Sequence, residues 1–176
     1  MNRTHEVFNQ STPLADVNLW RINRPLRDAL AALAPTLDAA SLDALDALGA
    51  EMGSAEMQAH ARLANQHPPQ LHTHDRTGRR SDEVEFHPSY HALMAAALRH
   101  GLHGTAWTAG PGSHLLRAAG FMLFTEAEPS VLCPVSMSYA VAPALRANPA
   151  LQAAWGPLLA ATAYDRRFNP RPARPR

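Results

Sequence analysis

The 176-residue sequence contains no lysine and only one cysteine, Cys133. A single thiol cannot form an intrachain disulfide or a zinc site built from several thiolates, so both are excluded for this chain. Redox chemistry by paired thiols is excluded within a monomer for the same reason. Because lysine is absent, arginine is the residue that supplies the permanent positive charge. Alanine and proline are abundant. This composition suggests a GC-rich coding sequence rather than an arginine pattern selected for nucleic acid.

Long apolar runs are also missing. No uninterrupted apolar stretch approaches the roughly 20 residues that a membrane-spanning helix needs. Residues 1–6 lack the apolar core of a secretory signal. We therefore expect a soluble, cytoplasmic protein without a membrane partner. The chain length and the hydrophobic fraction of 46% permit one sizeable core, so we expect one domain over residues 1–165.

The formal charge of +1 is unevenly distributed. Residues 165–176 hold five arginines and one acid, whereas residues 1–164 hold eleven arginines and fourteen acids and carry a net charge of −3. Residues 166–176 alternate proline with arginine and have almost nothing to bury, so we expect a disordered tail there. Its arginines could contact nucleic acid weakly and with a strong dependence on salt.

Apolar residues recur at helical spacing through most of the chain, except in about the first two dozen residues, which predict an extended arm and not a helix. Capping residues and prolines mark the expected helix boundaries. The predicted helices are Pro25 to Pro35, Asp38 to about Gly49, Ser54 to about Ala64, Pro88 to Gly101, Ser113 to Phe124, Pro134 to Leu145 and Pro149 to Leu158. This alternation of helix and loop predicts an all-α bundle and argues against a Rossmann-type domain.

The segment between Gln66 and Pro88 is polar and predicts a long ordered loop that can include a small hairpin. Asp75-Arg76-Thr77-Gly78 has the residue types of a tight turn. The only candidate metal ligands gather in this part of the chain, since imidazole and carboxylate groups suit zinc or iron. They are His67, His72, His74, Asp75, His87 and His91. Their spacing fits no standard site, and His87 precedes Pro88 as a helix cap would, so polar loop and capping roles are favoured.

Cys133 would be a nucleophile only if a histidine and an orienting acid converged on it, so a buried structural thiol is the preferred interpretation. Residues 110–114, Gly-Pro-Gly-Ser-His, match neither a nucleophile elbow nor a phosphate-binding loop, and a turn followed by a helix cap explains them.

Glu126 and Glu128 lie close to an apolar run, where a buried carboxylate could act as a base. Solvation, or pairing with an arginine such as Arg117, is the alternative that we favour. Met122 and Met137 could line an acyl pocket because thioethers adapt to flexible chains, but core packing is the more common role of such methionines.

Several sequence runs together resemble the amino-terminal region of AidB-type proteins, the acyl-CoA dehydrogenase relatives of the adaptive alkylation response. The resemblance extends over about residues 4–165. The runs are THEVFNQ at 4–10, GSAE at 53–56, RLAN at 62–65 followed by Pro68-Pro69, THDR at 73–76 with GRR at 78–80, DEVEFHP at 82–88 leading to His91, and CPVSMSYA at 133–140.

This resemblance implies an acyl-CoA dehydrogenase-like N-terminal helical bundle with an extended arm. In full-length relatives such a bundle packs on a β-domain, helps to wall the active-site cavity and joins subunit contacts. The family's FAD-contacting segment, a run like MTEKQGGSD, follows later and is not in this sequence. No catalytic, cofactor-binding or metal-binding residue is therefore assigned, and FAD is expected only in full-length relatives.

Two departures from the family pattern stand out. Residues 129–131 are Pro-Ser-Val where the family has a pattern close to Ala-Gly-His, so Pro129 is expected to bend or shorten a helix. After Tyr164-Asp165 the sequence turns into the Pro/Arg tail, which suggests a frameshift or early stop in a longer gene.

We expect an N-terminal domain of a flavoprotein of the DNA alkylation response that is inactive alone and associates with itself or with flavoprotein domains. The alternative is a non-enzymatic interaction module that binds nucleic acid weakly through its tail.

Overall fold

The computed structural model describes residues 4–167, which form helices and one small antiparallel sheet. The expected disordered tail lies outside the described residues beyond Arg167. The elements are α1 (Leu19–Ile22), α2 (Arg24–Leu33), α3 (Ala39–Met52), α4 (Ala55–Gln66), β1 (Gln70–His74), β2 (Arg80–Glu85), α5 (Pro88–Arg99), the 3₁₀ turn η1 (Gly104–Trp107), α6 (Ser113–Thr125), α7 (Leu132–Ala144), the 3₁₀ turn η2 (Leu145–Ala147) and α8 (Pro149–Leu159).

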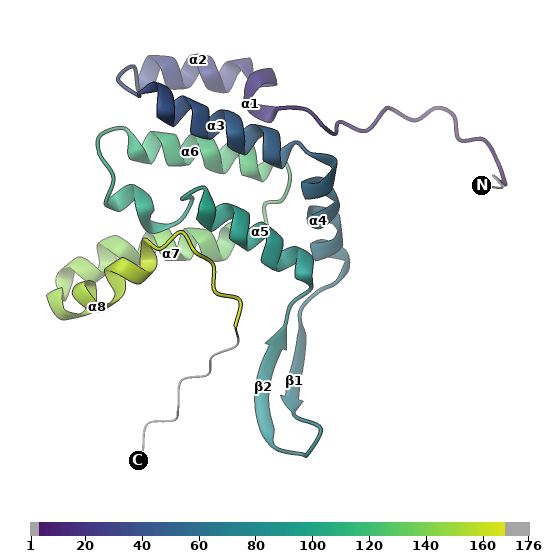
Figure 1. Cartoon of the computed structure of the whole chain (residues 1–176), viewed down its shortest axis with the longest axis vertical. Helices are drawn as coiled ribbons and strands as arrows, with labels where there is room; N and C mark the ends of the chain where they lie inside the picture. Colours follow the sequence, from purple (N-terminus) through teal and green to yellow (C-terminus); the bar gives the residue numbers. More distant parts are fainter. Residues whose placement is uncertain (1–3, 168–176) are drawn as a thin grey trace.

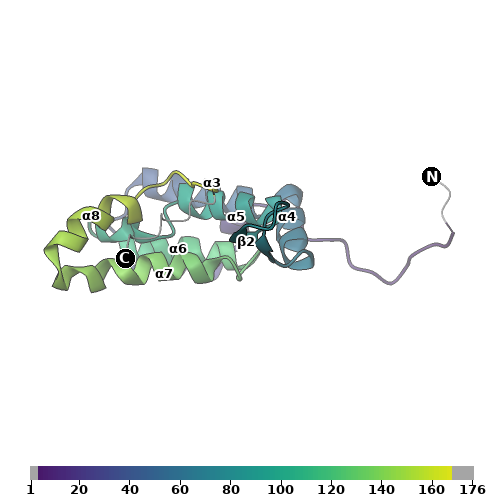
Figure 2. The same ribbon diagram turned by 90° about the horizontal axis from the view of Figure 1, so that it is seen from below.

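The helices form one elongated body around α3 and α6, which run side by side (Figure 1). Helix α1 packs on α3, α2 contacts α6, and α5 lies between α4 and α7. Helix α8 continues from α7 at the end of the body away from α4, and the N-terminal arm extends from the opposite end (Figure 2). None of the helices within residues 4–167 has both the length and the apolar character needed to cross a membrane.

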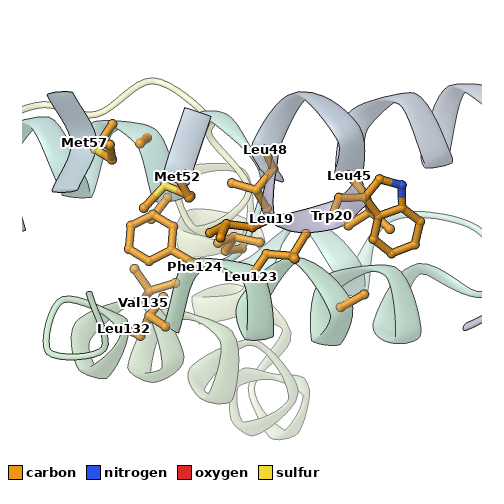
Figure 3. Packing of buried hydrophobic residues seen from close by; sticks show 14 of the residues in the cluster. Leu19, Trp20, Leu45, Leu48, Met52, Met57, Leu123, Phe124, Leu132 and Val135 are labelled. Atoms are coloured by element: carbon orange, nitrogen blue, oxygen red, sulfur yellow. The ribbon is translucent and has the colours of Figure 1, made fainter. Parts of the chain in front are cut away.

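The core lies where α3, α6 and α7 meet. The Phe124 ring of α6 is fully buried between Met52 of α3 and Val135 of α7 (Figure 3). Leu48 and Leu123 extend this layer towards α1. Each such side chain contributes about 1.5–3 kcal/mol by leaving water, so this layer holds the three helices together.

Local sequence signals set most helix boundaries as predicted. The Asp38 carboxylate accepts a hydrogen bond from the Ser41 amide at 2.8 Å, and the Ser54 hydroxyl accepts one from the Met57 amide at 3.1 Å. The ring of His87 accepts from the Ser89 amide at 3.2 Å, so its predicted capping role is confirmed. Pro25, Pro88 and Pro149 stand in the first turns of their helices, where a missing amide hydrogen costs nothing.

The predicted arm is wrong at its end, because residues 19–22 form α1. The Asn18 side chain caps this short helix, and both Leu19 and Trp20 are buried. Gly49 lies close to the end of α3, as predicted, and the helix continues to Met52. A Cβ atom at Gly49 would lie 2.5 Å from the Trp20 amide nitrogen, so the glycine is what lets α1 approach α3.

Two other helices begin elsewhere than expected. Ser113 is the first residue of α6 and not its cap; Gly112, with a φ of +83°, precedes it, and the Ser113 hydroxyl donates to the Ala106 carbonyl. Helix α7 begins at Leu132, two residues before Pro134. It can start early because a buried carboxylate, Glu128, accepts a hydrogen bond from the Val131 amide.

The segment expected as a long ordered loop contains the small hairpin for which the prediction left room. Strands β1 and β2 pair antiparallel, with Leu71 opposite Val84, and project away from the helical body (Figure 1). The predicted turn is confirmed, because the Asp75 carboxylate accepts from the Thr77 and Arg79 amides and Gly78 has a φ of +81°. The all-α prediction is therefore right for the body and wrong for this hairpin.

Candidate functional site

The most unusual surface of the molecule is formed by α7 and α8. Between Glu128 and Asp165 the chain has one charged residue, Arg146, and neither of the two helices contains any. The exposed positions of α7 are all apolar and recur at the spacing of one helix face. They are Cys133, Met137, Ala140, Val141 and Ala144.

Helix α8 repeats this pattern with larger side chains. Leu151, Trp155 and Leu158 recur at spacings of four and three residues and are 45%, 39% and 65% exposed. We call the exposed residues of α7 and α8 the uncharged surface. A helix that is apolar on all sides is normally buried, so this surface has the composition of an interior.

Three side chains that were predicted to be buried are exposed. Cys133, expected to be buried, is exposed because Leu132 and Val135 occupy the core-facing positions of α7. Met137 and Met122 were expected in the core, but they are 67% and 54% exposed. Neither methionine lines a closed acyl pocket within the described residues, and both lie on the outside of the body.

A cluster of aromatic and basic side chains fixes the inner side of α7. The Trp107 indole donates to the Tyr139 carbonyl at 2.8 Å, and His114 Nδ1 lies 2.9 Å from the Tyr139 hydroxyl. The Arg117 guanidinium carbon lies 3.8 Å from the centroid of the Tyr139 ring, a cation–π arrangement. Burial lowers the pKa of Arg117. The predicted pairing of Arg117 with Glu126 or Glu128 is wrong, since its Nε donates to the Leu102 carbonyl instead.

The two glutamates have different environments. Glu126 is exposed and accepts a hydrogen bond from Asn23. Glu128 is 1% exposed, which corrects the prediction that it is solvated or paired with arginine. Its Oε1 accepts from the Asn65 side chain at 3.0 Å and its Oε2 from the Val131 amide at 2.8 Å. Both oxygens are therefore engaged in joining α4 to the start of α7, which favours a structural role over that of a base.

The histidines considered as metal ligands are spread over separate contacts. His72 Nε2 lies 2.8 Å from a Glu85 carboxylate oxygen on the hairpin, whereas His74 contacts Thr73. The rings of His67 and His87 stack with centroids 4.7 Å apart, and His91 lies 2.8 Å from the Tyr164 hydroxyl. Within residues 4–167, no three or more histidine, cysteine or acidic side chains are grouped so that they could hold a metal ion.

One charged cluster was not predicted from the sequence. Glu51 of α3 bonds both Arg99 and His100 at the end of α5, and the His100 distance is 2.8 Å. The His100 hydrogen bond, followed by that from Arg99, lowers the pKa of Glu51 to about 2. This cluster ties α3 to α5 across 48 residues of sequence, and no local pattern marks it.

Comparison with known proteins identifies the family. The model of the family described as "Adaptive response protein AidB N-terminal domain" matches residues 9–166. The putative acyl-CoA dehydrogenase AidB of Escherichia coli K12 is 39% identical over 173 residues, which cover 96% of this chain and 31% of the E. coli protein.

Solved structures show the same architecture. The apo form of Bd2924 superposes with a TM-score of 0.77 at 27% identity, covering 89% of this chain and 32% of that one. ACDH-11 of Caenorhabditis elegans, solved in complex with C11-CoA, superposes with a TM-score of 0.74 over 92% of this chain and 29% of its own; at 18% identity this likeness concerns the fold alone. The chain thus spans about a third of the length of these proteins, and it belongs to the AidB family, corresponding to the family's N-terminal domain.

Proposed function

We propose that this chain forms the helical N-terminal layer of an acyl-CoA dehydrogenase-like flavoprotein assembly of the DNA alkylation response, and that it is inactive alone. The uncharged surface is where it packs on the remainder of that assembly. The observation that carries the proposal is the absence of charge from both α7 and α8, although much of each helix faces solvent.

Physical chemistry supports a covered surface. A helix on the outside of a stable protein normally carries charged residues on its solvent side. The central part of a protein interface is instead depleted of charge. Met137 and Leu158 are each about two-thirds exposed, and exposed apolar area of this kind favours association. The relatives are about three times as long as this chain, so a full-length protein of this kind has enough further sequence to cover the uncharged surface.

We assign no residue of this chain to FAD, the cofactor implied by the family resemblance. The cavity between α3, α5 and α6 measures about 350 Å³, and the one beside α4 lined by Gln58 and Arg62 about 510 Å³. Pockets for drug-sized ligands measure roughly 300–1,000 Å³, so both cavities lie in the lower half of that range. We therefore assign no chemical step to a flavin within this chain, and our proposal gives it a packing role.

The test is co-purification. The full chain is expressed together with the part of E. coli AidB that lies beyond the matched region. We expect the wild-type chain to be retained on the tagged E. coli fragment, and Met137→Glu with Leu158→Glu to abolish retention, because two charges would be buried without partners. Leu33→Glu, at an exposed leucine of α2, is the matched control and should still be retained.

Two results would contradict the proposal. One is failure of the wild-type chain to be retained while both proteins are folded; the other is equal retention of the doubly charged variant. The absorbance spectrum of the isolated chain after incubation with FAD and removal of the excess gives an independent check, because a retained flavin band would contradict a purely packing role.

A further inference from the structure

Arg117 of α6 is a half-buried cation without an anionic partner. Its Nε donates to the Leu102 carbonyl at 2.7 Å, whereas its Nη2 is shielded from solvent and has no hydrogen-bond partner. Within residues 4–167 no carboxylate forms an ion pair with its guanidinium. Desolvated charges in proteins are normally paired, since leaving one unpaired is costly.

The guanidinium is held in place before any ligand arrives. It stacks on the Tyr139 ring at 3.8 Å and lies 5.0 Å from the Phe121 ring centroid. Tyr139 is itself fixed by hydrogen bonds with Trp107 and His114. Little side-chain entropy therefore remains to be lost when Arg117 binds an anion.

Arg117 lines the cavity of about 350 Å³ between α3, α5 and α6. Leu45, Leu48 and Leu116 contribute apolar walls, and no acidic residue lines the cavity. Arg99 and His100 also border it, but both are already bonded to Glu51. The charge left for a ligand is that of Arg117.

We propose that this cavity binds a small monocarboxylate with a compact apolar body. The carboxylate pairs with the charge of the Arg117 guanidinium at the edge that borders the cavity, since Nε is already bonded to Leu102 and Nη2 is shielded. The apolar body lies against Leu45, Leu48 and Leu116. The cavity volume falls at the lower end of the range for small-molecule sites, which favours a ligand of benzoate size. This site does not depend on the packing role of α7 and α8.

The experiment is a calorimetric titration of the full chain with sodium benzoate, and with benzyl alcohol as the uncharged molecule of the same shape. We expect one benzoate per chain and no measurable binding of benzyl alcohol. Arg117→Met should weaken benzoate binding by roughly tenfold or more, since a hydrogen bond to a charged group is lost.

Because Arg117 also packs on Tyr139, a second pair of variants keeps the test decisive if Arg117→Met does not fold. Ala44 and Ala47 are both exposed on α3, but only Ala44 lines the cavity. Ala44→Trp should fill the cavity and weaken benzoate binding, whereas Ala47→Trp should bind like the wild type.

Three outcomes would overturn the proposal: no benzoate binding by the folded wild-type chain, equal binding of benzyl alcohol, or equal binding by the two tryptophan variants. If benzoate does not bind, the partner of Arg117 is instead a carboxylate of another protein segment. The titration uses the isolated chain, so its failure is separate from failure of the co-purification.

Discussion

Replacing the buried carboxylate of Glu128 tests how α7 is attached to the body. Glu128→Ala leaves the Val131 amide without its acceptor and removes one acceptor of the Asn65 side chain. Hydrogen bonds to a charged group are worth about 1.5–3 kcal/mol each. Asn65 also donates to the Ala61 carbonyl, which lessens its loss. We therefore expect the free energy of unfolding to fall by about 3 kcal/mol.

The assay is urea unfolding followed by far-ultraviolet circular dichroism. With a slope of about 2 kcal/mol per molar urea, the midpoint should fall by roughly 1.5 M. Glu128→Gln keeps the side-chain volume and one oxygen acceptor, but its amide NH₂ group faces one of the two N–H donors. The free energy of unfolding should therefore fall by about half as much as for Glu128→Ala. Glu126→Gln is the matched control, because Glu126 is exposed, and it should change the free energy by less than about 0.5 kcal/mol.

A midpoint for Glu128→Ala that equals that of Glu126→Gln would refute this reasoning. It would mean that α7 starts without the carboxylate and that the short Val131 contact contributes nothing to stability.

Three further predictions rest on separate contacts. Because the pKa of Glu51 is lowered to about 2 from 4.5, its stabilising effect is complete above pH 4.5 and is lost as the pH falls towards 2. In urea titrations over that pH interval, the free energy of unfolding of the wild type should fall by about 1 kcal/mol more than that of Glu51→Gln. The control Glu83→Gln, on the hairpin, should behave as the wild type. Gly49→Ala should lower the free energy of unfolding by about 1–3 kcal/mol, seen as a lower thermal midpoint, because its Cβ meets Trp20 of α1; an unchanged midpoint would mean that α1 shifts freely. Cys133 should react with a thiol reagent in the folded chain as fast as in urea, and slow labelling of the native state would place it in the interior.

The elements that could be predicted from the sequence are those set by neighbouring residues. Asp38, Ser54 and His87 each bond an amide two or three residues ahead, so a short motif was enough to locate the helix starts. The turn at Asp75 was found for the same reason. The architecture was predicted from the family resemblance, and the family match over residues 9–166 confirms that resemblance.

The errors arose where distant residues decide the outcome. Helix α1 has four residues and depends on its packing against Gly49, which no local pattern shows. Glu128 is buried because its partner Asn65 comes from another helix. Helix α7 carries no charge on any side, so the sequence pattern did not show which face meets the core, and Met137 was assigned to the wrong face. The scarcity of charge over residues 129–164, where Arg146 is the one charged residue, was the available signal for the uncharged surface.

The exposure of the β1–β2 hairpin affects local unfolding of the protein. All described residues of both strands are exposed except Ser81, which is half-buried, so almost none of its area contributes to the core. Its ladder can therefore open and close as a separate cooperative unit while the helical body stays intact. Amide hydrogens of Leu71 and Val84 should exchange with solvent long before those of Phe124. The hairpin tip at Gly78, where an added side chain would meet nothing, is a position where extra residues can be inserted at little cost to the fold of the body.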